Sequence, residues 1–206
     1  MNILVISATI DEIRPSLAFL EKQQIDYLVT GVGMLATTYN LTKYLQRNDV
    51  DFILQVGIGG ILDRNVELGE VVRIKSDEIF RLGAENQDSF INIADLGFGK
   101  SIYTGLIPED WPTPNVVEAR GITVNTVHGK QESINALYEE YPTLLVESME
   151  GAALFLVSEH EQIPCMQFRS ISNYIEPRNR ESWNIGLAVK NLNIFLQKIL
   201  KDFKRI

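Results

Sequence analysis

Short apolar runs alternate with segments of helical periodicity along most of this chain. Runs bounded by Gly, Ser or Asn predict strands at 2–8, 25–30, 52–56, 70–75, 121–125, 143–146 and 166–171. Helices are predicted at 11–23, after G-V-G-M up to about Arg47, at 131–140, from Glu150 and from about Ser182. Such alternation is typical of helices layered on a sheet. The 206 residues therefore predict one α/β domain spanning 1–206, three-layered, with a central mixed β-sheet flanked by helices.

Between residues 80 and 120 this regular pattern breaks down. Gly and Pro crowd the segment, which ends in P-E-D-W-P-T-P. We expect long loops with short pieces of strand here. In a compact domain, loops of this length usually serve function or an interface.

Charge and cysteine content exclude several classes of protein. A net charge of −8 argues against nucleic acid as a partner, which would require a basic patch. The one cysteine, Cys165, excludes an internal disulfide, fits a reducing compartment and is interpreted as a buried apolar residue. The N-terminus lacks the pattern of a signal peptide, and no run approaches the ~18 apolar residues of a membrane span. We therefore expect a cytoplasmic protein with no membrane partner.

Two polar residues follow apolar segments in positions where ligands bind to α/β folds. Glu150 begins a predicted helix, and Asn173 ends a predicted strand 23 residues later. Both are expected to face the same edge of the sheet. A carboxylate and a carboxamide that converge there can bind a sugar hydroxyl and a polar heterocycle. The alternative for Asn173 is a turn-forming residue, which is common after a strand.

Other candidates are carboxylates, a histidine and glycines after strands. Glu12 follows the first strand, next to an aspartate that could cap a helix. His128 is interpreted as a loop residue that could line a pocket, since no metal-ligand spacing surrounds it. Gly57 belongs to one of three glycine-containing turns that permit close approach to a ligand. None of these turns fits a dinucleotide or nucleoside triphosphate fingerprint, so we expect no organic cofactor and no metal.

Several of these segments together resemble the purine nucleoside phosphorylase and nucleosidase superfamily. They are, in chain order, T-G-V-G, V-G-I-G-G, E-S-M-E-G-A-A and R-S-I-S-N. The resemblance covers most of the chain outside the irregular middle. It implies a nucleoside phosphorylase-like fold, a nucleoside as substrate and a homodimer. It also implies that Glu12 is the general base on water, that Met149 and Glu150 hold the ribose, and that Val127 and His128 lie near the base.

The chain departs from the family pattern at two positions. Adenine-specific nucleosidases carry aspartate where this chain has Asn173, and a carboxamide suits a 6-oxopurine such as hypoxanthine better than adenine. Hexameric phosphorylases carry arginine where this chain has Gln55. Loss of that bidentate phosphate ligand favours water as the nucleophile.

The run R-S-I-S-N-Y-I-E-P-R-N-R resembles the signature of the futalosine hydrolase family. This implies hydrolysis of futalosine to hypoxanthine in menaquinone biosynthesis. Arg178 or Arg180 would then pair with the aryl carboxylate on the 5′ side of the substrate, or else lie on the surface near Glu176 or Glu181. The alternatives are a 5′-methylthioadenosine/S-adenosylhomocysteine nucleosidase, a phosphorylase, and a non-catalytic nucleoside-binding protein.

Overall fold

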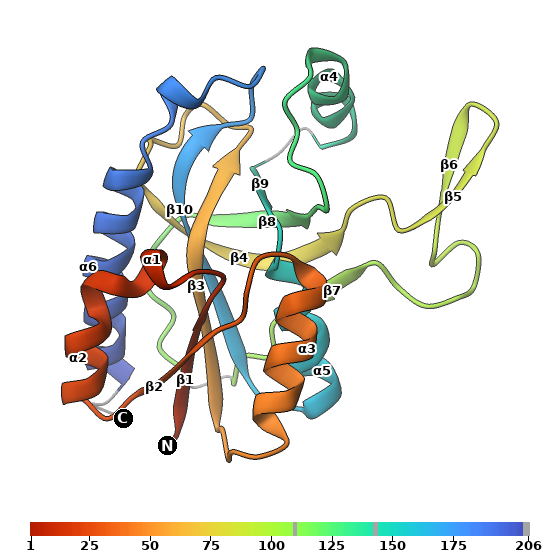
Figure 1. The fold of residues 1–206 in the computed structure, drawn as a ribbon. Helices are drawn as coiled ribbons and strands as arrows, with labels where there is room; N and C mark the ends of the chain where they lie inside the picture. Colours follow the sequence, from red (N-terminus) through yellow and green to blue (C-terminus); the bar gives the residue numbers. More distant parts are fainter. Residues whose placement is uncertain (109–110, 142–143, 204–206) are drawn as a thin grey trace.

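The computed structural model describes residues 1–108, 111–141 and 144–203 (Figure 1). The strands are β1 Ile3–Ser7, β2 Asp26–Val29, β3 Phe52–Ile61, β4 Val71–Ile79, β5 Gly83–Asn86, β6 Ser89–Asn92, β7 Ile102–Thr104, β8 Glu118–Thr123, β9 Leu145–Ser148 and β10 Cys165–Tyr174. The helices are α1 Ile10–Ile13, α2 Leu17–Lys22, α3 Met34–Leu45, α4 Gln131–Glu140, α5 Gly151–Glu161 and α6 Ile185–Phe203, with 3-10 turns at Arg14–Ser16 and Arg180–Ser182.

Eight strands form one mixed sheet in the order β10-β4-β8-β9-β3-β1-β2, with β7 paired to β4. Strand β3 runs parallel to β1 and β10 and antiparallel to β9, while β10 also pairs antiparallel with β4. Strands β3, β10, β4, β8 and β9 therefore form a closed ring, from which β1 and β2 extend. The predicted α/β class with a central mixed sheet is confirmed.

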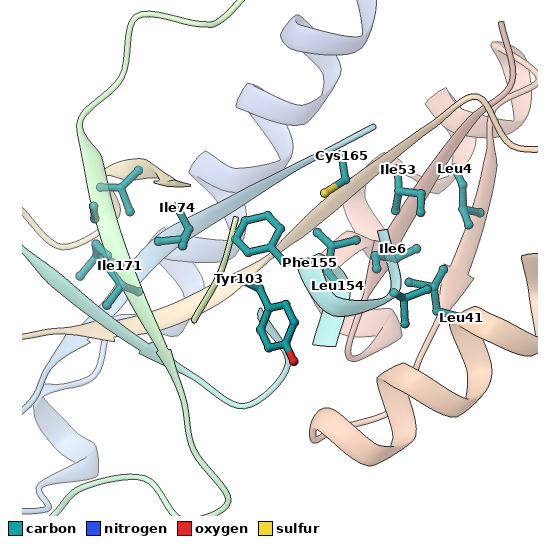
Figure 2. Close-up of a cluster of buried hydrophobic side chains, with 14 of the residues drawn as sticks. Leu4, Ile6, Leu41, Ile53, Ile74, Tyr103, Leu154, Phe155, Cys165 and Ile171 are labelled. Carbon is teal, nitrogen blue, oxygen red and sulfur yellow. The ribbon is translucent and has the colours of Figure 1, made fainter. Parts of the chain in front are cut away.

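Helices cover both faces of the sheet and bury two main apolar clusters (Figure 1). On one face, α6 packs Leu192, Leu196 and Phe203 with the inner side chains of β1, β3 and β10. On the other face, α3 and α5 cover the second cluster, of which Figure 2 shows Leu41 and Phe155 among the strand residues. The three layers leave the C-terminal ends of β1, β3 and β10 close together.

Cys165 belongs to the second cluster, as the sequence predicted (Figure 2). Its side chain is fully buried, and burial raises the pKa of the thiol to about 12. The thiolate is therefore scarce at neutral pH, which fits a packing residue and not a nucleophile.

The expected turn at Gly57, Gly59 and Gly60 is wrong, because β3 continues through these residues to Ile61. Strand β10 pairs with β3 along this stretch, with Arg169 opposite Gly57. A Cβ atom on Gly57 would lie 2.4 Å from Nη1 of Arg169. These glycines therefore allow close packing within a strand and do not reverse the chain.

The predicted helix at 11–23 is also corrected, since it consists of α1, a 3-10 turn and α2. The interruption includes Pro15, whose ring removes a backbone N–H from the helical hydrogen-bond pattern. Other elements agree more closely with expectation, and the helix at 131–140 is found with these bounds. The predicted strand at 143–146 is found as β9, although residue 143 lies outside the described residues.

The irregular middle segment contains the β5–β6 hairpin, which projects from the sheet in Figure 1, followed by β7 and the start of β8. Residues 109–110 of P-E-D-W-P-T-P lie outside the described residues. In the described part of the chain, no helix is long and apolar enough to cross a membrane. The prediction of one domain spanning 1–206 stays a prediction.

Candidate active site

A cavity of about 280 Å³ lies where the C-terminal parts of β1, β3, β9 and β10 meet. Six of the predicted site residues line it together: Glu12, Val127, His128, Met149, Glu150 and Asn173. They come from four separate segments of the chain, which the sheet brings to one edge. The cavity has the size range and partly apolar lining of a small-molecule site.

Glu12 is buried at 8% exposure, and both of its carboxylate oxygens are held by donors. Oε1 accepts from the backbone N–H of Ile58 at 3.0 Å, and Oε2 accepts from the Thr9 N–H at 2.9 Å and the Thr9 hydroxyl at 3.1 Å. Burial raises the pKa of Glu12 above its ordinary value, and the charge of Arg169 opposes part of that rise. The result is a fixed carboxylate of raised basicity on the cavity wall.

Glu150 is the N-cap residue of α5, and its side chain is also buried. Its Oε1 accepts from the backbone N–H of Gly33 at 3.0 Å. Its Oε2 forms an ion pair with Nη1 of Arg169 at 3.5 Å. A carboxylate anchored from two sides can accept hydrogen bonds from sugar hydroxyls without first having to be oriented.

Arg169 is only 1% exposed; it forms an ion pair with Glu150, and its charge acts on Glu12. The position of a Cβ on Gly57 would lie 2.4 Å from Nη1 of Arg169 and 2.9 Å from Oε1 of Glu12. Gly57 does not line the cavity, and its lack of a side chain leaves room for the Arg169 guanidinium and the Glu12 carboxylate. Among the described residues, Nη2 of Arg169 has no hydrogen-bond partner.

Asn173 lies within β10 and does not form a turn, which removes the alternative interpretation. Its Oδ1 accepts from the Ser172 hydroxyl at 2.8 Å, and its Nδ2 donates to the carbonyl of Tyr174 at 3.0 Å. These bonds fix which end of the carboxamide is the donor. One N–H of Nδ2 and one lone pair of Oδ1 are left for a ligand.

His128 is oriented by Glu147, whose carboxylate pairs with Nδ1 of the ring and accepts from the backbone N–H of His128. The ring packs edge-on against Phe80, with centroids 5.1 Å apart. Val127 and Met149 pack against the apolar cluster under α4. This side of the cavity therefore offers apolar walls and the Nε2 edge of the imidazole.

Arg178 and Arg180 do not line the cavity. Both guanidinium groups lie over the ring of Trp183, at 5.4 Å and 6.0 Å from its centroid, and Trp183 lines the cavity. Both arginines are exposed, and Glu176 pairs with Arg64 instead. One aromatic side chain, that of Trp183, therefore separates the two cations from the cavity.

The charged side chains that line the cavity, among the described residues, are acidic: Asp11, Glu12, Glu147 and Glu150. No group of His, Cys, Asp and Glu in the described part of the chain has the arrangement of a metal site. A wall of carboxylates is a poor environment for a phosphate dianion.

Arg169 is the main residue of the site that the sequence did not single out. It lies in a run that reads as a buried strand, where a charged side chain is costly unless it is paired. A charged residue in such a run therefore indicates a paired side chain, but the sequence does not show that the ion-pair partner is Glu150.

Comparison with known proteins gives consistent matches over nearly the whole chain. A family model described as the phosphorylase superfamily matches residues 16–205. A futalosine hydrolase of Streptomyces coelicolor is 31% identical over 182 residues, which cover 84% of this chain and 77% of that protein. A second, of Acidothermus cellulolyticus, is 27% identical over 183 residues, covering 81% and 71%.

Solved structures with the same fold include enzymes of two kinds. The futalosine hydrolase of Helicobacter pylori superimposes with a TM-score of 0.74 at 16% identity, covering 98% of each chain. A 5′-methylthioadenosine/S-adenosylhomocysteine nucleosidase of Neisseria meningitidis, in complex with methylthio-immucillin-A, gives a TM-score of 0.76 at 12% identity, covering 98% of this chain and 99% of that one. At these identities the likeness is one of fold.

Proposed function

This chain belongs to the phosphorylase superfamily, and on that basis we propose that it is a nucleosidase that hydrolyses the N-ribosidic bond of futalosine and releases hypoxanthine. The observation that carries the proposal is the convergence of Glu12, Glu150 and Asn173 on one cavity. The reaction belongs to the futalosine route to menaquinone. The relatives that share 27–31% of their aligned residues with this chain are futalosine hydrolases.

Cleavage of an N-ribosidic bond builds positive charge on the sugar and negative charge on the departing base. The bonding electrons leave with the base nitrogen, and the oxygen of water forms the new bond to the anomeric carbon. Glu12 accepts the proton of that water, since its raised pKa makes it a stronger base than an exposed glutamate. Glu150 accepts hydrogen bonds from the ribose hydroxyls, while Met149 packs beside the sugar.

Asn173 selects the base. The remaining N–H of its carboxamide donates to O6 or N7 of hypoxanthine, and the remaining lone pair of Oδ1 accepts from a protonated ring nitrogen. Val127 contacts the face of the base, and His128 presents its Nε2 edge to it. Hydrogen bonds to the departing base lower its basicity and so favour its departure.

Water, and not phosphate, is the nucleophile in this proposal. Gln55, which stands where hexameric phosphorylases carry arginine, is buried and does not line the cavity. The carboxylates on the wall would repel phosphate, whereas neutral water can bind beside Glu12.

The aryl carboxylate of futalosine is bound by Arg178 or Arg180. Both cations lie over Trp183 at the edge of the cavity, and both are free of ion pairs with the described residues. A 5′ substituent that leaves the cavity beside Trp183 would meet them. This gives the site a preference for a substrate with an anionic 5′ extension over a plain nucleoside.

The enzyme acts as a homodimer in the cytoplasm. Val32 lines the cavity, and α3 continues from it with Leu35 and Tyr39, which are 82% and 64% exposed. An apolar surface next to the substrate is well suited to a second copy of the chain. The cytoplasm is a reducing compartment, which fits a single unpaired cysteine.

A product assay tests the proposed function. The purified protein is incubated separately with futalosine, inosine and methylthioadenosine, with and without phosphate, and free base is measured by chromatography. We expect hypoxanthine from futalosine without phosphate. A strict requirement for phosphate would favour a phosphorylase instead, and tight nucleoside binding without turnover would favour a non-catalytic binding protein.

A further inference from the structure

Asp77, on β4, is a buried carboxyl outside the cavity that hydrogen bonds connect to Arg169, the ion-pair partner of Glu150. It is 1% exposed and is not among the residues that line the cavity. Its Oδ1 accepts from the hydroxyl of Thr123 at 2.7 Å, and its Oδ2 accepts from Nε2 of Gln167 at 3.2 Å. Gln167 Oε1 in turn accepts from Nε of Arg169 at 3.0 Å.

Asp77 packs closely against two glycines, at positions where a side chain would collide with its carboxyl. A Cβ atom on Gly151 would lie 1.9 Å from Oδ2 of Asp77, and one on Gly121 would lie 2.4 Å from it. The same Cβ on Gly151 would lie within 2.8 Å of both polar atoms of the Gln167 amide. The carboxyl is thus enclosed between β8, β10 and the first turn of α5.

We propose that Asp77 is a positioning residue for the nucleosidase reaction: its carboxylate fixes the amide of Gln167, and that amide holds the Arg169 guanidinium beside Glu150, from where its charge acts on Glu12. In its ionised form Asp77 can only accept hydrogen bonds, so it requires the NH2 group of Gln167 to face it. The carbonyl end must then face Arg169, which can only donate. With the amide reversed, an oxygen would face Asp77 and an NH2 group would face Arg169.

Arg169 is the group through which Asp77 and Gln167 affect the pKa of Glu12. Its charge lowers the pKa of Glu12 against the effect of burial, while Glu150 raises it. Arg169 and Glu150 also act on Asp77, whose pKa burial raises to about 7. From α6, the residue that contacts Glu12 is the neutral Asn193, which donates to its carbonyl. If the Arg169 guanidinium lost its hydrogen bond to Gln167 and moved away, the pKa of Glu12 would therefore rise.

The test is a carbon-13 NMR titration of the glutamate carboxyls in the whole protein, with the Glu12 signal assigned by its loss in Glu12→Gln. Gln167→Met removes both polar atoms at nearly constant size and charge. Asp77→Asn leaves a side chain that can accept from only one of its two donors. Ser170→Ala is the matched control, since Ser170 is buried on the same strand but points to the opposite face and bonds to Gly69.

A cation within ~4–6 Å lowers a carboxyl pKa by ~1–3 units. We therefore expect the titration midpoint of the Glu12 carboxyl to rise by roughly one pH unit in Gln167→Met and in Asp77→Asn. In Ser170→Ala the midpoint should not change. Removal of the Asp77 charge alone would move the midpoint down. Unchanged or lower midpoints in both variants overturn the proposal. A rise in Gln167→Met alone confines the role to Gln167 and overturns the assignment to Asp77. If Gln167→Met does not fold, Asp77→Asn decides by the same criterion.

The inference rests on the proposed function, but the two fail separately. The titration uses the protein without substrate, so it gives a result even if futalosine is not cleaved. For an active enzyme, the acid limb of the kcat/KM profile with futalosine should move by the same amount as the Glu12 midpoint. A merely structural role would lower activity at every pH and leave that limb in place.

Discussion

Replacement of Asn173 by aspartate changes the hydrogen bonds offered to the base while nearly preserving the size of the side chain. In the structure, Nδ2 has two hydrogens, one of which donates to the Tyr174 carbonyl. The other is available to the base. An introduced carboxyl has at most one proton, which can serve Tyr174 or the base but not both. The variant therefore loses one hydrogen bond to hypoxanthine.

A lost hydrogen bond to a buried polar group costs about 1–3 kcal/mol, or roughly a 5- to 150-fold reduction in kcat/KM for futalosine. The same change provides a second acceptor for the 6-amino group of adenine, so kcat/KM for methylthioadenosine should rise. Steady-state assays of both substrates with wild type and Asn173→Asp measure the ratio. Asn173→Ala is the control, and it should weaken both substrates. Equal factors for the two substrates in Asn173→Asp would refute the reasoning on base selection.

Four further changes test other parts of the site. Glu12→Gln should lower kcat by roughly 10²- to 10⁴-fold. It should also abolish the acid limb of the pH–rate profile, because the rate of the wild type falls as pH falls through the raised pKa of Glu12. If the variant keeps the acid limb, that limb belongs to the titration of another group. Gly57→Ala should lower the free energy of unfolding by about 1–3 kcal/mol and reduce activity, because the added Cβ would collide with the Arg169 guanidinium. A denaturant titration measures this, and an unfolding midpoint equal to that of the wild type would contradict it. Arg178→Ala/Arg180→Ala should raise KM for futalosine more than for inosine, and equal changes would exclude a contact with the 5′ carboxylate. If α3 forms the interface of the proposed homodimer, Leu35→Glu should lower the mass measured by light scattering from that of a dimer to that of a monomer, whereas an unchanged mass would contradict an interface at Leu35.

The sequence was sufficient to predict the layered fold and the shared edge where Glu12, Glu150 and Asn173 meet. The reason is physical: strands with apolar runs must be covered on both faces, and polar residues that follow such strands have one edge at which to collect. The six residues found around the cavity lie in or shortly after the C-terminal ends of strands, although Val127 and Met149 are apolar and Asn173 lies within β10.

Features that depend on contacts between distant segments were not predictable. Glycine usually favours turns, yet Gly57 lies in a strand because the neighbouring strand places an arginine beside it. Arg169 itself reads as an isolated charge in an apolar run, and its partners Gln167 and Glu150 become visible only when β10 and the start of α5 are placed. The break at Pro15 shows the reverse case, in which a local constraint overrides helical periodicity.

The most direct measurement of substrate choice is a competition between futalosine and methylthioadenosine at equal concentration, in one phosphate-free reaction with the wild-type enzyme. The initial rates of hypoxanthine and adenine release give the ratio of the two kcat/KM values. Hydrolysis directed by Glu12 and Asn173 predicts that hypoxanthine predominates. Adenine as the main product would contradict the assignment of Asn173 and favour a methylthioadenosine nucleosidase.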